Sequence, residues 1–265
     1  MNLFRFNYDR PGPGVRKDEP QKNAFIRFFA ILFRKFTQFI ELNLLFAAFV
    51  FGAFVVVYLV SSFIPNIPDW LILFLIILLV SPFLAGLTFV TRNYAREEHA
   101  FLMSDFLEAS QKNWKAFLIN GVVCYFLYFI LSVAIKFYYS KLAYGLWYGF
   151  SLCICIAIAL LLIFAQYYVP VMIITFDLKL IQIYKNALIF AILGLWRNLL
   201  LTIFLGLLAA FLYFSSAIVL TFLIGIAFTI TLLFSFSSFL INFTIYPLIY
   251  KTMILPQEKP DNNRK

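Results

Sequence analysis

The sequence predicts an all-α membrane protein with six transmembrane helices, and three observations lead to that fold class. Of its 265 residues, 64% are apolar and 12% are charged, whereas about a quarter of residues are charged in soluble domains. The mean hydropathy is +0.94. Residues 198–250 contain no Asp, Glu, Lys, Arg or His. Only lipid tolerates such a run, so we expect a multi-pass protein of the plasma membrane.

Six stretches reach about 20 apolar residues, the length that crosses a bilayer as a helix. They lie near residues 40–64, 70–90, 116–135, 144–176, 199–219 and 224–250. The fourth is long for one straight crossing, and the turn between the last two is poorly marked. The N-terminal segment lacks an apolar core followed by a cleavage site, so the first span is expected to act as its own insertion signal.

The basic residues orient these spans. Nineteen of the 21 Lys and Arg residues fall in the N-terminal segment, the second and fourth connections and the C-terminal segment, and only Lys136 and Lys141 fall on the other side. The positive-inside rule therefore predicts that both termini are cytoplasmic. The same charges are expected to attract anionic lipid head groups. A nucleic-acid partner is not expected, because it requires a basic face on a soluble module.

Three segments repeat one order of features: an aromatic residue at the membrane entrance, an outward span, a return span and a proline near its end. The entrances are Phe36, Trp114 and Trp196, and the prolines are Pro82, Pro170 and Pro247. We interpret the pattern as three helical hairpins, near 25–92, 99–176 and 178–254, that arose by duplication. The alternative is coincidence, because Trp and basic residues gather at any membrane interface and proline is common in membrane helices.

The hairpins form one predicted membrane domain, residues 25–255, between a basic tail at 1–24 and a second tail at 256–265, both cytoplasmic. Segments 25–36, 99–115 and 178–195 mix apolar and charged residues, a pattern typical of helices that lie in the interface. Each proline removes a helical hydrogen bond and should kink its helix. Three such breaks could shape a shared cytoplasmic-side cavity; simple packing kinks are the alternative.

The stretch RNYAREEHAF, residues 92–101, holds the only histidine. If Glu97, Glu98 and His99 lie on a helix, successive side chains step by about 100° and cannot converge on one metal ion. We therefore expect Arg92 and Arg96 near lipid phosphates, while the glutamates face water or a partner. The candidate docking residues are Arg92, Arg96, Glu97, Glu98, His99 and Asp105.

The sequence predicts no catalytic residue, cofactor or metal. It contains neither a phosphate-binding nor a dinucleotide-binding glycine motif, and one histidine cannot form a zinc pair. Three cysteines lie in apolar segments and are interpreted as small hydrophobic residues. Glu41 lies at the mouth of the first span, either within the bilayer, where it would be a functional candidate, or among the head groups. Asn43, Asn120 and Asp177 are further candidates, with interhelical hydrogen bonds as the alternative.

Three blocks resemble the YesL-like family of small bacterial membrane proteins: YDRPGPGVRKDEP at residues 8–20, SPFLAGLTFVTRNYAREEHAFLMSDF at 81–106 and TFDLKLIQIYKNA at 175–187. The REEH and SDF elements are the most specific, although Met103 stands where we expect tryptophan. The resemblance implies no reaction, since the family has no known function. It does imply a context, because members are often encoded beside carbohydrate ABC-transport components and their sensors.

Three functions are weighed on this basis. The first is a non-enzymatic accessory to carbohydrate uptake whose cytoplasmic helices dock a sugar ABC transporter or sensor. The second is a transporter of sugars or amphiphiles, with a cavity lined by proline-broken helices. An intramembrane enzyme comes third, because acids and bases are scarce within the spans.

Overall fold

The computed structural model describes residues 23–64, 66–215 and 219–258, and within these ranges the chain is helical with no strand. The α-helices are α1 (Ala24–Arg34), α2 (Phe36–Phe63), α3 (Asp69–Val80), α4 (Phe83–Ala95), α5 (Leu102–Ser140), α6 (Leu146–Thr175), α7 (Leu180–Leu193), α8 (Leu195–Ser215), α9 (Val219–Phe228), α10 (Phe234–Ile249) and α11 (Leu255–Glu258). A 3₁₀ turn, η1 (Leu142–Tyr144), and two π-helical segments, η2 (Thr229–Leu233) and η3 (Tyr250–Ile254), complete the path. The predicted all-α class is confirmed. The predicted tails lie mostly outside the described residues.

Five helical runs are long and apolar enough to cross a membrane: α2, α5, α6, α8 and the run Val219–Ile254. A sixth crossing requires α3 and α4 to act as one span, although they are bent by 52° where Ser81 and Pro82 separate them. Only 11–17% of the most apolar window in each of the five is buried inside the protein. The remaining apolar surface needs lipid around it.

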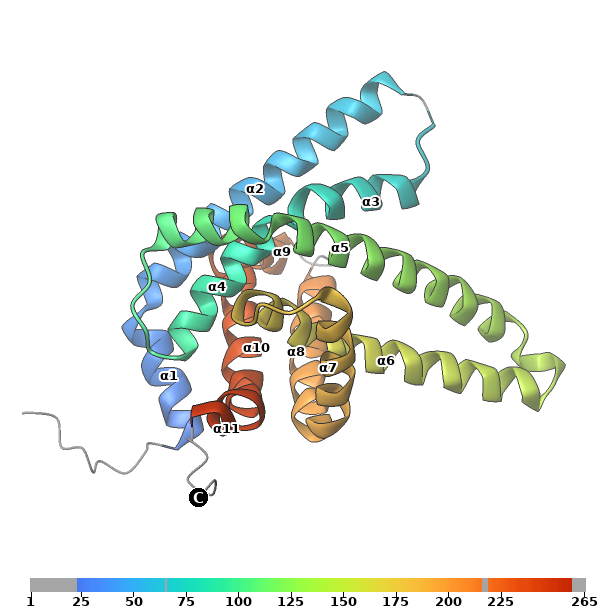
Figure 1. The fold of residues 1–265 in the computed structure, drawn as a ribbon. Helices are drawn as coiled ribbons and strands as arrows, with labels where there is room; N and C mark the ends of the chain where they lie inside the picture. Colours follow the sequence, from blue (N-terminus) through green and yellow to red (C-terminus); the bar gives the residue numbers. More distant parts are fainter. Residues whose placement is uncertain (1–22, 65, 216–218, 259–265) are drawn as a thin grey trace, which may run out of the picture.

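The spans form hairpins. α2 pairs with α3, α5 with α6 and α8 with α9, and Figure 1 shows the first two pairs as arms that project from a common centre. Gly145 lies at the turn before α6 with a φ of 152°, a backbone conformation that glycine adopts without a Cβ clash. The described helices therefore pair in the chain order α2 with α3, α5 with α6 and α8 with α9.

Helix α4 lies at the centre, in contact with α2, α5, α6 and α10. Ten of its 13 residues are buried. Gly86 permits the close approach of α5, because a Cβ at this position would lie 2.4 Å from the backbone oxygen of Phe106. Two apolar clusters meet around α4: one joins it to α1, α2 and α10, and the other joins α6, α7 and α10.

Separate short helices occur in two of the three segments that the sequence predicts to lie in the interface. α1 and α7 are separate short helices, close to the predicted 25–36 and 178–195. The separate helix predicted at 99–115 is wrong, since its residues from Leu102 onward are the first third of the 39-residue helix α5. No Gly or Pro interrupts the chain between Leu102 and Asn120, and Asn113 bonds the carbonyl of Ala109 one turn earlier. The helix therefore continues into the span.

Candidate functional site

The loop at residues 96–101 follows α4, and its geometry differs from the helix assumed in the sequence analysis. α4 ends at Ala95, and Glu97 adopts a φ of 60°. The carboxylates and His99 thus sit on a turn. Among the described residues, no group of three His, Cys, Asp or Glu side chains could hold a metal ion. His99 is exposed and its ring lies 4.7 Å from that of Phe101.

Glu97 fastens α1 to this loop. Its two carboxylate oxygens accept hydrogen bonds from Arg27 Nε at 2.8 Å and from Arg34 Nη2 at 2.7 Å. Lys35 adds a bond from Nζ to the carbonyl of Glu98 at 3.2 Å. Glu98 pairs with Arg96. The expectation that both glutamates face water or a partner is therefore wrong for Glu97, whose oxygens are occupied within the chain.

We call the contacts of Glu97 with Arg27 and Arg34 the α1 latch. These contacts also shift the pKa of Glu97. Hydrogen bonding from Arg34 is the main cause that lowers the pKa of Glu97, and Arg27 adds to it against some desolvation. A depressed pKa means that the latch contributes stability above the ordinary glutamate value, about 4.3, and loses it only as pH falls through the lower folded-state pKa. Burial lowers the pKa of Lys35.

We expect Glu97→Gln to release α1 without unfolding the bundle. The pairs are partly exposed, so each contributes at most about 1 kcal/mol. Hydrogen exchange of residues 24–34, corrected for intrinsic rates, should accelerate in this variant and remain constant in the native chain from pH 8 to about pH 5. Glu41→Gln removes an exposed carboxylate that forms no salt bridge with another described residue, and it serves as the control. Loosening of the native α1 between pH 7 and pH 5 would contradict the depressed pKa.

Arg92 points inward, so its expected place among lipid phosphates is wrong. Its side chain is buried, and Nη1 donates to the carbonyl of Ile174 and to Thr175 Oγ1, both at 3.1 Å. Nη2 donates to Asn93 Oδ1 at 3.0 Å, and the guanidinium lies over the Phe89 ring. Ile174 and Thr175 end α6, where free carbonyls and the helix dipole favour a cation. Arg92 therefore joins α4 to the end of α6.

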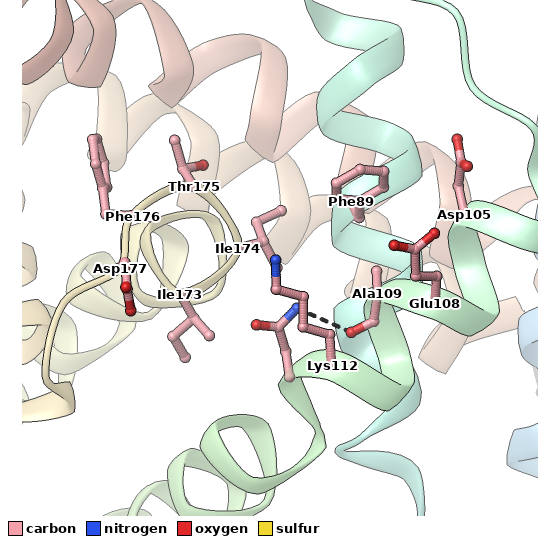
Figure 2. Close-up of a pocket in the computed structure, with 11 residues that line it drawn as sticks. Phe89, Asp105, Glu108, Ala109, Lys112, Ile173, Ile174, Thr175, Phe176 and Asp177 are labelled. Carbon is pink, nitrogen blue, oxygen red and sulfur yellow. Dashed lines mark hydrogen bonds between the residues drawn. The ribbon is translucent and has the colours of Figure 1, made fainter.

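A cavity of about 500 Å³ lies beside this junction. Figure 2 shows one wall from α5, another from the end of α6, and Phe89 from α4. The lining residues are Phe89, Asp105, Glu108, Ala109, Lys112, Asn113, Ile173, Ile174, Thr175, Phe176 and Asp177. We call this space the acidic cavity. Its volume is in the range of small-ligand pockets. Arg92 does not line the cavity, but it contacts three of the lining residues, Phe89, Ile174 and Thr175.

The charges of the acidic cavity are unbalanced. Asp105, Glu108 and Asp177 face a single cation, Lys112, and none of the three carboxylates forms a salt bridge with another described residue. Among the described residues, Asp105 accepts one hydrogen bond, from the backbone N–H of Phe101 at 2.9 Å. Three carboxylates around an open space, beside apolar Phe89 and Phe176, suit a positively charged group with an apolar stem.

Residues 39–135 match a family described as "Protein of unknown function, DUF624". The match covers 97 of the 265 residues, less than half of the chain. The resemblance to the YesL-like family is consistent with that match. The matched segment contains α3 and α4, the 96–101 loop and the α5 wall of the acidic cavity. No curated protein and no solved structure matches the chain.

Two other candidate residues, Asn43 and Asn120, have structural partners. Asn43 is buried and its amide bonds the π-helical segment η2: Nδ2 donates to the carbonyls of Thr229 and Ile230, and Oδ1 accepts from the N–H groups of Phe234 and Ser235. Asn120 and Gln166 exchange hydrogen bonds between α5 and α6. Glu41 is exposed on α2 and does not line the acidic cavity.

The three prolines have different effects. Pro82 separates α3 from α4 at the 52° bend. α6 continues through Pro170 to Thr175, and Pro247 lies within α10, three residues before η3. The acidic cavity is bordered by α4 and by the end of α6, so two of the three proline helices, rather than all three, adjoin it.

Sequence reasoning missed Glu108 and Lys112 as members of a site, and it assigned Asp177 to interhelical bonding. The available signal was weak. Glu108 and Lys112 are one helical turn apart, and Asp177 lies two residues after the end of a 30-residue apolar helix. Nothing in the spacing shows that segments 105–113 and 173–177 meet, because that contact depends on how α5 and α6 pair.

Proposed function

We propose that the chain is a non-enzymatic membrane protein that binds a protein partner through its cytoplasmic face, as an accessory to carbohydrate uptake. The acidic cavity is the docking site, and Lys or Arg side chains of the partner are its occupants. The observation that carries the proposal is the group of three carboxylates without salt bridges around one cavity. The carbohydrate context rests on the family resemblance alone.

The orientation in this proposal follows from charge. Nineteen of 21 basic residues fall on the side of the predicted tails, so the positive-inside rule places that side in the cytoplasm of a plasma membrane. On such a basic side, a local excess of carboxylates is distinctive. It would attract a cationic segment over a short range, because salt screens exposed charges beyond about 8–10 Å. The repeated hairpin order further supports an origin by duplication, with the cavity between the first and second hairpins.

The test is affinity purification of the full chain in mild detergent from cells grown on an inducing sugar. We expect sugar-transporter or sensor subunits to copurify with the native chain. In the variant Asp105→Asn/Glu108→Gln/Asp177→Asn, the yield of these subunits should fall at least tenfold. Glu41→Gln is the matched control, since it removes an exposed carboxylate outside the cavity. Equal capture by all three chains would contradict the docking role.

Transport is the second candidate, and the position of the acidic cavity favours it. The cavity opens beside α4, which begins after Pro82, and beside the end of α6, which contains Pro170. Polar contacts between Asn120 and Gln166 continue along α5 and α6. Purified protein in liposomes should then move a solute, and the Asp105→Asn/Glu108→Gln pair should abolish uptake. Glu41→Gln should have no effect. Absence of flux across sugars and cationic amphiphiles would eliminate transport.

A further inference from the structure

Helix α1 has an apolar outer face that no described residue covers. Phe28, Ile31 and Leu32 are buried against the core. On the opposite side, Phe25 is 70% exposed and Phe33 is 71% exposed. A short helix at a water-facing surface would carry polar residues there. Aromatic side chains on both faces instead suit a helix whose outer side enters lipid.

A basic edge runs between these two faces. Arg27 and Arg34 are seven residues apart, two turns of one helix edge, and both bind Glu97. Two guanidinium groups share one carboxylate, so the edge keeps an excess positive charge. This excess lies directly before α2, the first span. At that position a side chain reaches the head-group layer.

The two arginines are used differently. Arg27 makes two further contacts within the protein: its Nη2 donates to the carbonyl of Ala95, and its guanidinium lies over the Phe243 ring. The side chain of Arg34 is 57% exposed and places one Nη2 contact on Glu97. Guanidinium has five N–H donors. The remaining N–H donors of Arg34 form no hydrogen bond with a described residue. They are therefore available to bind a ligand beside Phe33.

We propose that Arg34 and the outer aromatic face of α1 bind an anionic phospholipid, with the phosphate on the guanidinium and an acyl chain against Phe29 and Phe33. The charge of the edge and the apolar face beside it fit the two halves of one lipid molecule. This site is separate from the acidic cavity, which has the opposite charge, and it requires no protein partner.

The test is a titration of the full chain in neutral detergent with phosphatidylglycerol and with phosphatidylcholine, followed by native mass spectrometry of the bound lipid. Phosphatidylglycerol should bind more tightly. Arg34→Gln should weaken its binding about fivefold, the effect of one basic residue near an anionic lipid surface. Arg27→Gln removes the same charge from the same helix and should weaken binding less. Lys185→Gln, an exposed basic residue on α7, should have no effect.

Phe33→Ser provides a second variant that leaves both contacts to Glu97 in place, and it should weaken both lipids. Several results would overturn the proposal: equal affinity for the two lipids, equal losses in Arg34→Gln and Lys185→Gln, or full displacement of phosphatidylglycerol by millimolar inorganic phosphate. A dimer that dissociates in Phe33→Ser would show that a second copy, rather than lipid, covers this face.

Discussion

Replacing Asn43 by leucine is expected to destabilise the folded protein by about 3 kcal/mol, since four hydrogen bonds are lost together. The π-helical segment η2 interrupts the regular bonding of the last helical run, and Asn43 satisfies the first two carbonyls of η2 and the two N–H groups that follow it. Leucine has the same number and branching of side-chain heavy atoms but is larger and has no polar atom. Because lipid offers no replacement partner, the backbone groups would remain unpaired.

Thermal unfolding in detergent, read from tryptophan fluorescence, measures this loss. The control is Gln38→Leu, which removes an exposed amide from the same helix, five residues earlier. It should change the midpoint little. If Asn43→Leu were as stable as the control, the π-helical segment would not depend on the Asn43 amide.

Gly86→Ala is the second substitution with a large expected effect. The added Cβ would lie 2.4 Å from the backbone oxygen of Phe106 and 2.6 Å from Ser110 Oγ. The serine can rotate, but the backbone of α5 must move. We expect a loss of about 2–3 kcal/mol, as for other overpacked cores, and a widened acidic cavity, because α5 forms one of its walls.

The matched control for this change is Gly52→Ala on α2, where an added Cβ meets nothing within 4 Å. There, alanine should be neutral or stabilise the helix by up to about 1 kcal/mol, since it is the better helix former. Thermal unfolding of the two variants side by side gives the comparison. A destabilised Gly52→Ala beside a native-like Gly86→Ala would contradict the packing described for α4 and α5.

Much of the fold follows from composition. Lipid-length apolar runs and polar turns predict the spans to within a few residues, and the charges around 25–36 predict α1, because both depend only on local sequence. The length of α5 was not predictable in this way. Charged residues at 105–115 resemble a surface helix, yet nothing breaks the backbone before Asn120, so the helix continues into the span.

The site was less predictable because it depends on partners distant in sequence. Arg92 and Arg96 look equivalent at a helical spacing, but only Arg92 meets the end of α6, 82 residues further on. Likewise Glu97 and Glu98 are adjacent in the sequence, but the two arginines of α1 bind Glu97, whereas Glu98 pairs with Arg96. A substitution of both glutamates would disturb the α1 latch as well as any docking. Neutral variants within the acidic cavity separate the two effects.

In the proposed function, the acidic cavity receives a cationic segment of a carbohydrate-uptake protein. Site-specific photo-cross-linking tests it most directly, with benzoylphenylalanine in place of Phe176 at the cavity rim and, as the control, in place of Tyr139, an exposed residue at the far end of α5. Under sugar induction, we predict a cross-linked transporter or sensor subunit from position 176, lost when Asp105, Glu108 and Asp177 are neutralised. Identical adducts from both positions, or adducts that persist after neutralisation, would contradict the claim.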